Sequence, residues 1–140
     1  MPIADARSAD YWAATTNHVL ALPKCADCGQ LAFPPDVVCP RCRSISPQFA
    51  FEAVTGNGTI RSWIVVHDSF LPGFAADLPF VLVDVELDEQ QDLRMIGRLL
   101  DGPNVALHVG DRVAVAFEDL ADTVSIPAFE LQLSDPAKAP

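Results

Sequence analysis

The sequence predicts a mainly β protein with a short N-terminal helix, a zinc ribbon and a C-terminal barrel of the oligonucleotide/oligosaccharide-binding (OB) type. Two Cys-x-x-Cys pairs lie ten residues apart in a chain of 140 residues that has no other cysteine. Downstream of these pairs the sequence changes to short alternating apolar runs, which are typical of strands. Half of the residues, 50%, are hydrophobic, which is enough for a genuine core.

The first predicted element is a short amphipathic helix that begins at Ser8 and ends near Asn17. Ser8 and Asp10 are residues that favour a helix N-terminus. Tyr11 and Trp12 need a surface to cover, because a helix this short is marginal alone. That surface is either the ribbon of the same chain or another subunit, and the sequence leaves both open.

The segment CADCGQLAFPPDVVCPRC is predicted to hold one structural zinc ion. Four thiolates without a histidine are typical of a closed, tetrahedral structural site, and disulfides are rare in a reducing cytosol. Gly29 suits the turn after the first pair, whereas Arg43 would be strained by about 1 kcal/mol if its φ were positive. Iron or two disulfides are the alternatives. The expected ligands are Cys25, Cys28, Cys39 and Cys42.

Strands are expected in the segments FAFEAVTG, NGTIRSWIVVHDSF, PFVLVDVELD, LRMIGRLL and DRVAVAFEDL. Gly56-Asn57-Gly58 is predicted to turn before the second of these segments, and Gly110-Asp111 before the last one. Five or six short strands with this spacing favour a small closed Greek-key barrel. The residues expected to face its interior are Trp63, Val65, Val81, Val83, Val85, Val113, Val115 and Phe117.

The expected organisation is a helical segment over 1–22, the ribbon over 23–46, the barrel over 47–133 and a flexible tail over 134–140. The first residues lack the basic start and apolar run of a signal peptide. No segment approaches the roughly 18 apolar residues of a membrane helix. We therefore expect a cytoplasmic protein without membrane contact.

Taken together, the motifs resemble the family called domain of unknown function 35, over roughly residues 8–131. The resemblance rests on DYW, CADCG followed by FPP, CPRC, TGNGTIRSWIVVH, LPFVLVDVELD and VGDRVAVAFED. It implies a rubredoxin-like ribbon joined to an OB barrel, with acyl-coenzyme A (acyl-CoA) in the crevice between them. The chain departs from the family at Asp36, where Arg is frequent, and at Arg43, where Gly is frequent.

The same resemblance implies a non-catalytic partner of thiolase-fold enzymes. These enzymes include acyltransferases, condensing enzymes and lipid-transfer-protein-like aldolases of steroid side-chain degradation. The simplest assembly is a heterotetramer with two copies of each chain, because thiolase-fold enzymes are usually dimers. In such an assembly this subunit stabilises the enzyme and shapes its acyl-CoA channel.

Charge argues against the main alternative, a ribbon and barrel that bind single-stranded nucleic acid. Residues 1–45 carry four basic and four acidic residues, whereas the remainder carries five basic and fifteen acidic ones, so the formal net charge of −10 belongs to the barrel half. Nucleic-acid binding depends on a positive track. Arg41 and Arg43 either offset the zinc–thiolate charge of about −2 or contact an ADP phosphate of coenzyme A.

Apolar residues outside the strands are the other candidates for binding. A pantetheine arm and an acyl chain fit a mostly apolar groove. The loop HDSFLPGFAADLP would be costly to expose, so it either folds over the barrel or meets a partner or ligand. The expected acyl-CoA or partner contacts are Phe33, Pro34, Pro35, Arg41, Arg43, Phe70, Leu71, Phe74 and Phe80.

No catalytic activity is expected of the chain by itself. His67, Asp68 and Ser69 are neighbours on an extended chain, where successive side chains point in alternating directions and do not form a relay. All four cysteines are assigned to the metal, so none remains as a nucleophile. The chemistry would therefore belong to the partner enzyme.

Overall fold

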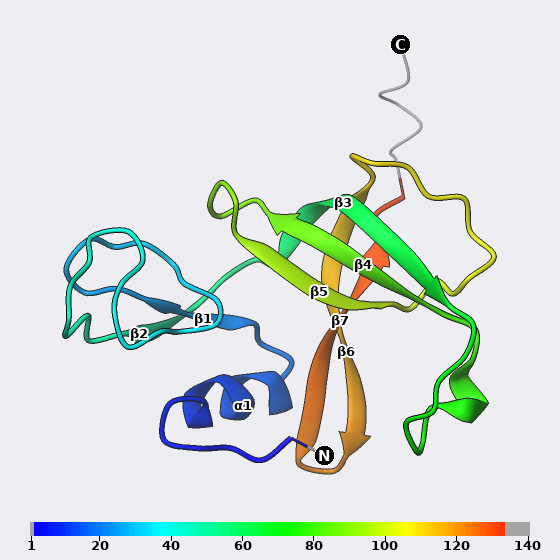
Figure 1. The fold of residues 1–140 in the computed structure, drawn as a ribbon, viewed down its shortest axis with the longest axis horizontal. Coiled ribbons are helices and arrows are strands. Elements are labelled where there is room, and N and C mark those ends of the chain that lie inside the picture. Colours follow the sequence, from blue (N-terminus) through cyan, green and yellow to red (C-terminus); the bar gives the residue numbers. More distant parts are fainter. Residues whose placement is uncertain (1, 134–140) are drawn as a thin grey trace.

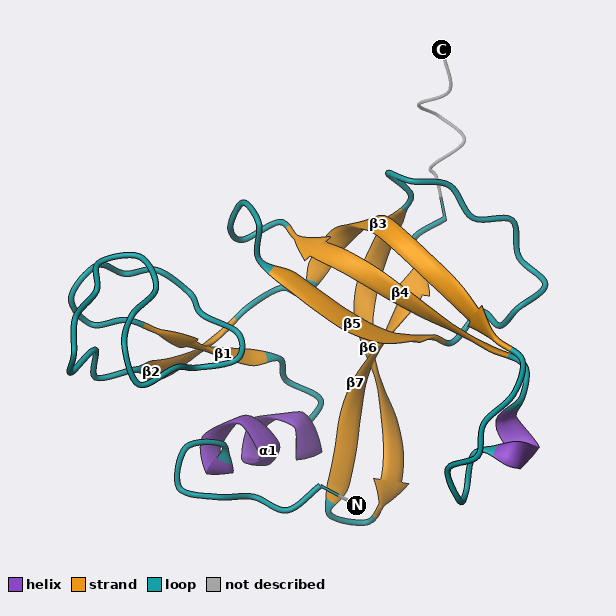
Figure 2. Ribbon diagram, viewed as in Figure 1, coloured by secondary structure: helices purple, strands orange, loops and turns teal. Residues whose placement is uncertain are grey.

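The N-terminal third of the chain forms a helix and a ribbon that lie beside a β-barrel (Figures 1 and 2). The structure is a computed structural model and describes residues 2–133, so the tail expected at 134–140 lies outside the described residues. The elements are α1 (Ala9–Thr16), β1 (Ala21–Lys24), β2 (Ala50–Ala53), β3 (Asn57–Val66), η1 (Ala75–Asp77), β4 (Phe80–Leu87), β5 (Arg94–Leu99), β6 (Arg112–Ala121) and β7 (Val124–Leu131). No helix among the described residues has the length and apolar character needed to cross a membrane.

Helix α1 packs inside its own chain. Tyr11 is buried, and its ring centroid lies 4.9 Å from that of Trp12 and 5.7 Å from that of Phe33 in the ribbon. Thr16 Oγ1 donates a hydrogen bond to the carbonyl of Thr123 at 3.0 Å, which ties the helix to the β6–β7 turn. The sequence left open whether Tyr11 covers the ribbon of its own chain or another subunit. The structure shows that it covers the ribbon of its own chain.

The ribbon contains a small antiparallel sheet in which β1 pairs with β2, from Ala21↔Ala53 to Lys24↔Ala50. The prediction that FAFEAVTG belongs to the barrel is therefore wrong. An apolar alternation fits any half-buried antiparallel pair, and only the pairing partner, which lies far away in sequence, distinguishes the two sheets.

Strands β3 to β7 form a closed barrel in the order β3-β4-β5-β7-β6, which confirms the OB-type prediction. Alternate residues of β4 point into the barrel, and Val81, Val83 and Val85 are each at most 1% exposed. Val113 of β6 is likewise buried, and partly buried Val115 and Phe117 pack against the same core.

Two of the expected interior residues are exposed instead. Trp63 is 37% and Val65 is 38% exposed. Strand β3 pairs with β6 only from Asn57 to Thr59, while it pairs with β4 as far as Val66. Within residues 2–133, the edge of β3 on the side of β6 therefore has no paired strand after Thr59.

Strand β7 was not among the strands expected from the sequence, because Pro127 interrupts its apolar run. It pairs with β6 along its length but with β5 only at Leu99↔Phe129. Most of its second edge is free, and proline is tolerated at such an edge. Phe129 fills the barrel centre, and a Cβ at Gly97 would lie 2.8 Å from its ring.

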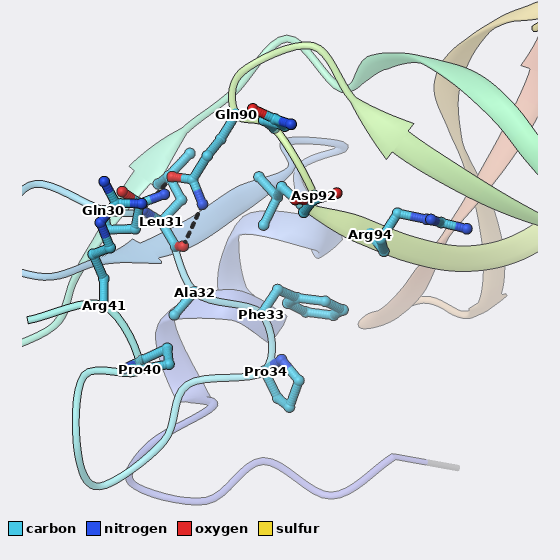
Figure 3. Close-up of a pocket in the computed structure, with 12 residues that line it drawn as sticks. Gln30, Leu31, Ala32, Phe33, Pro34, Pro40, Arg41, Gln90, Asp92 and Arg94 are labelled. Atoms are coloured by element: carbon cyan, nitrogen blue, oxygen red, sulfur yellow. Dashed lines mark hydrogen bonds between the residues drawn. The ribbon is translucent and has the colours of Figure 1, made fainter. Parts of the chain in front are cut away.

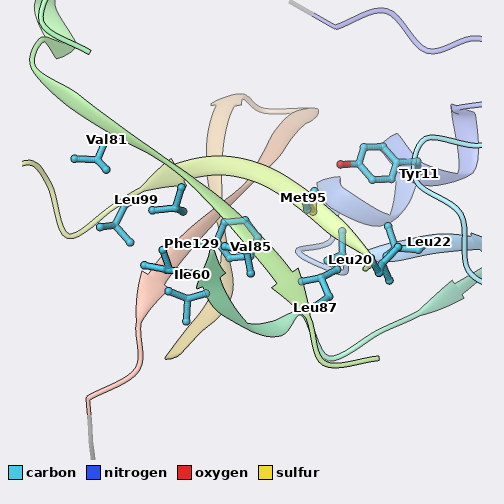
Figure 4. Packing of buried hydrophobic residues seen from close by; sticks show 13 residues of the cluster. Tyr11, Leu20, Leu22, Ile60, Val81, Val85, Leu87, Met95, Leu99 and Phe129 are labelled. Carbon is cyan, nitrogen blue, oxygen red and sulfur yellow. The ribbon is translucent and has the colours of Figure 1, made fainter. Parts of the chain in front are cut away.

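One hydrophobic cluster joins the barrel to the N-terminal part (Figure 4). Leu20, Leu22 and Tyr11 belong to the same buried cluster as the barrel residues around Phe129. Burial of this kind stabilises by about 25 cal/mol per Å² of apolar surface. The ribbon and the barrel therefore share a core.

Candidate functional site

The four cysteines converge at one point of the ribbon. Their sulfur atoms all lie within 4.8 Å of one another. Two of the distances are 3.9 Å, between Cys25 and Cys42, and 3.7 Å, between Cys28 and Cys39. A tetrahedral zinc ion with Zn–S bonds of about 2.3 Å requires S···S distances of about 3.8 Å. The donor set and its spacing therefore fit one zinc ion.

Both Cys-x-x-Cys turns have the same backbone hydrogen bonds. The N–H of Gly29 donates to the carbonyl of Cys25 at 2.8 Å, and the N–H of Arg43 donates to the carbonyl of Cys39 at 2.9 Å. The φ angles are +72° at Gly29 and +62° at Arg43, so the left-handed arginine anticipated from the sequence is present. Arg43 stores strain because its Cβ approaches the following carbonyl oxygen.

Backbone amides support the thiolates of the ribbon. Hydrogen bonds from the N–H of Cys42 and, more weakly, of Arg41 lower the pKa of the Cys39 thiol to about 7. Cys25 and Cys39 are buried, whereas Cys28 and Cys42 face outward. Four sulfur ligands complete a tetrahedron, so an ion held here supplies structural cross-linking and leaves no coordination position for a substrate.

The turn between β4 and β5 holds both the ribbon and its linker. Gln90 Oε1 accepts a hydrogen bond from the N–H of Leu31 at 2.8 Å, and Gln90 Nε2 donates to the carbonyl of Leu31 at 2.9 Å (Figure 3). Its neighbour Glu89 accepts hydrogen bonds from Thr55 N–H at 2.6 Å and Gly56 N–H at 3.3 Å. These contacts set the position of the ribbon beside the barrel.

A first cavity of about 360 Å³ lies between the ribbon and this turn (Figure 3). Phe33, Pro34 and Arg41 line it from the ribbon side, and Asp92 and Arg94 line it from the barrel side. Arg94 is engaged in a two-point ion pair with Asp84. Arg41 forms no ion pair within residues 2–133, so its guanidinium is free to bind an anion.

A second, larger groove of about 760 Å³ runs from α1 and the ribbon to the loop that follows β3. Its lining is mainly apolar and includes Tyr11, Phe33, Phe74, Phe80, Leu82, Ile96, Leu120 and Pro127. Phe33 lines both cavities, because it lies between the ribbon and the barrel. The two cavities therefore border the same aromatic side chain, and Arg41 lines the first cavity while Phe74 lines the groove.

The residues expected to contact acyl-CoA or a partner do not all lie in one place. Phe33, Phe74 and Phe80 line the groove, while Pro34 and Arg41 line the first cavity. Pro35 lines a separate hollow between the ribbon and the N-terminal segment, and Arg43 lines none of these three cavities. Phe70 and Leu71 are 99% and 58% exposed and are not part of the groove lining.

Several lining residues were not recognised in the sequence. Gln90 reaches the ribbon across 59 residues of chain, and Leu120 and Pro127 reach the groove from the β6–β7 hairpin. No local motif marks such residues, because their role depends on which strands pair. Pro127 in particular lies in a strand that the sequence did not reveal.

Two family models match the chain in succession. The rubredoxin-like zinc ribbon domain of ChsH2 matches residues 12–45, and the C-terminal OB-fold domain of ChsH2 matches residues 51–118. In the solved structure of an "Ltp2-ChsH2(DUF35) aldolase", one chain is 26% identical and superimposes with a TM-score of 0.78, covering 94% of this chain and 98% of that one.

Sequence relatives have related names. A "DUF35 domain-containing scaffold protein" of Methanocaldococcus jannaschii is 27% identical over 99 residues, 71% of this chain and 67% of the relative. The 3-oxo-4,17-pregnadiene-20-carboxyl-CoA hydratase alpha subunit of Mycobacterium tuberculosis is 29% identical over 121 residues, 86% of this chain. A probable enoyl-CoA hydratase alpha subunit of Thermomonospora curvata is 28% identical over 130 residues. This chain spans only 37% and 38% of the lengths of these two subunits.

Proposed function

We propose that this chain, which belongs to the domain of unknown function 35 family of zinc-ribbon and OB-fold proteins, is a non-catalytic, acyl-CoA-binding accessory subunit of a thiolase-fold enzyme. The relatives named as a scaffold, as hydratase subunits and as part of an aldolase support a role as a subunit in lipid metabolism. The acyl-CoA contact and the kind of partner are our extension. The observation that carries them is that Phe33 lines both cavities.

An acyl-CoA molecule has the same sequence of polar and apolar parts as these cavities. Its phosphates would lie near Arg41, whose guanidinium is free of carboxylates. Its acyl group would pass Phe33 and enter the apolar groove, whose volume lies in the usual range for ligand sites. Each arginine of the barrel, in contrast, is already paired with a carboxylate: Arg61, Arg94, Arg98 and Arg112.

This pairing also bears on the nucleic-acid alternative. The four barrel arginines contact carboxylates, and the formal charge of the chain is −10. A continuous positive track is therefore absent from the barrel within residues 2–133, and non-specific binding to a polyanion depends on such a track.

The exposed apolar residues are suited to contact with the partner enzyme. Phe70 and Leu71 are exposed in the loop that follows β3, and Ile64 is exposed on β3 itself. Exposed large apolar residues on neighbouring segments favour a protein contact. Two copies of this subunit would present the same surface to a dimeric enzyme, which gives a heterotetramer.

Co-expression with thiolase-fold proteins of the same genome tests the proposal. We expect one of them to co-purify in a complex of two plus two chains by light scattering, and to need this chain for full acyl-CoA turnover. Replacing Leu71 and Phe74 together by Asp should weaken assembly, because a desolvated apolar contact gains two charges. The matched control replaces exposed Val37 and Ile45 of the ribbon by Asp. Turnover of acyl-CoA by the isolated chain, or full activity of the enzyme without it, would contradict the accessory role.

A further inference from the structure

Three charged side chains interrupt the apolar lining of the large groove. Arg98 of β5 lies 3.4 Å from Asp77 of η1 and 3.4 Å from Glu118 of β6, measured from Nη1 to the nearest carboxylate oxygen in each case. The guanidinium carbon also lies 5.4 Å from the ring centroid of Phe80. Two carboxylates from different elements thus share one cation inside the groove.

This cluster makes the groove electrically negative. One guanidinium and two carboxylates carry a formal charge of −1, and no other lysine or arginine lines the groove within the described residues. The surrounding barrel half carries fifteen acidic and five basic residues, so the excess of negative charge continues outside it. Both carboxylates lie near the same nitrogen, Nη1, so the positive charge of Arg98 is already balanced by two negative charges before a ligand enters.

We infer that Asp77 and Glu118 restrict the groove to acyl groups that carry no negative charge, an inference that rests on the proposed acyl-CoA function. A carboxylate on the acyl group would lose hydration among Phe74, Leu82 and Ile96 and would meet a net negative cluster, and both effects oppose binding. The same charge orients coenzyme A, because its phosphates are repelled by Asp77 and Glu118 and attracted to Arg41.

Two ligands of equal chain length test this selectivity. The co-purified complex binds decanoyl-CoA or its counterpart with a terminal carboxylate, sebacoyl-CoA, and calorimetry at pH 7.5 measures both affinities. We expect decanoyl-CoA to bind at least tenfold more tightly. In the variant Asp77→Asn/Glu118→Gln the ratio should fall to about one, because Arg98 is then free to pair with the terminal carboxylate.

Two further variants separate the effect of the charges in the groove from the effect of the overall charge of the chain. Glu130→Gln removes one negative charge from an exposed position of β7 outside the groove, so it should leave the ratio at its wild-type value. Glu118→Gln alone should give an intermediate ratio, which keeps the test informative if the double variant does not fold.

The possible outcomes separate a failure of this inference from a failure of the proposed function on which it rests. If no complex forms, or if the complex binds neither ligand, the proposed function fails. If both ligands bind the wild-type complex equally, the function stands and the inference of charge selection is overturned. A tenfold preference that survives in the double variant would overturn the assignment to Asp77 and Glu118.

Discussion

The side chain of Gln90 bonds both backbone groups of Leu31, accepting from its N–H at 2.8 Å and donating to its carbonyl at 2.9 Å. The side-chain amide of Gln90 thus forms the same pair of hydrogen bonds with Leu31 that a neighbouring strand would form. Since Glu89, the preceding residue, binds the linker at Thr55 and Gly56, a single turn bonds both the ribbon and its linker and adds to the shared core in placing the ribbon. The width of the groove between Phe33 and Phe74 depends on this placement.

Replacing Gln90 by Ala should therefore loosen the ribbon. The change leaves the partly buried N–H and carbonyl of Leu31 without their partner, which costs about 1–3 kcal/mol. We expect faster amide exchange at Leu31 and through the ribbon, measured by hydrogen–deuterium exchange, with little change in β4 and β5. The same substitution at exposed Gln91 is the control, and equal exchange in both variants would contradict a clamp at Gln90.

Removal of the metal should unfold the ribbon and spare most of the barrel. Elemental analysis should find one zinc per chain, and a strong chelator should lower the melting temperature until zinc is added back. Cys39→Ser, which removes a buried ligand, should reproduce the effect of the chelator. Stoichiometric iron, or a Cys39→Ser protein that melts like the wild type, would show that the site is not a structural zinc site.

Arg43→Gly should stabilise the protein. Arg43 has a φ of +62°, and a left-handed conformation costs a residue with a Cβ about 1–2 kcal/mol. Glycine avoids this strain, but it loses more conformational entropy on folding, which cancels part of the gain. We expect a gain of about 1 kcal/mol in the free energy of unfolding, measured with denaturant. Arg41→Gly removes the same kind of side chain from the same turn, at a residue without a positive φ, and should not stabilise. A loss of stability in Arg43→Gly would mean that the side chain contributes more than its strain costs.

Two valines of the barrel should respond differently to Asp. Val83 is 0% exposed, so Val83→Asp should lower the free energy of unfolding by several kcal/mol, on the order of 3 or more, because an unpaired charge is buried. Val65 is 38% exposed on the uncovered half of β3, so Val65→Asp should cost less than about 1 kcal/mol. Thermal melts of both variants decide this, and equal losses would mean that β3 is covered in solution.

Ionisation of Tyr11 should lower the stability of the folded protein at alkaline pH. Burial raises the pKa of Tyr11 to about 12, whereas in the unfolded chain the pKa is near the ordinary value of 10.0. The folded protein binds this proton more tightly, so its contribution is fully present below pH 10 and is lost as the pH rises toward 12. Two pKa units correspond to about 2.7 kcal/mol. Tyr11→Phe should remove this part of the alkaline decline in denaturant unfolding, and identical pH profiles would contradict it.

The sequence by itself determined the parts whose evidence is local. The candidate metal site follows from Cys-x-x-Cys spacing, because each pair and its turn lie within six residues. The sequence left the sign of φ at Arg43 open, and the structure gives it as positive. The burial of Val81, Val83 and Val85 follows from alternation, because a strand shows successive side chains to opposite faces. These signals do not depend on which strand pairs with which.

Only the tertiary structure decided the rest, because pairing between distant segments leaves no periodic signal. It placed β2 against β1 in the ribbon, and it left Trp63 and Val65 exposed where β6 departs from β3. It also brought Asp77, Arg98 and Glu118 together from three elements, each of which is unremarkable in its own segment. The site between ribbon and barrel is made by such long-range contacts, so the physical arrangement of strands, rather than any motif, creates it.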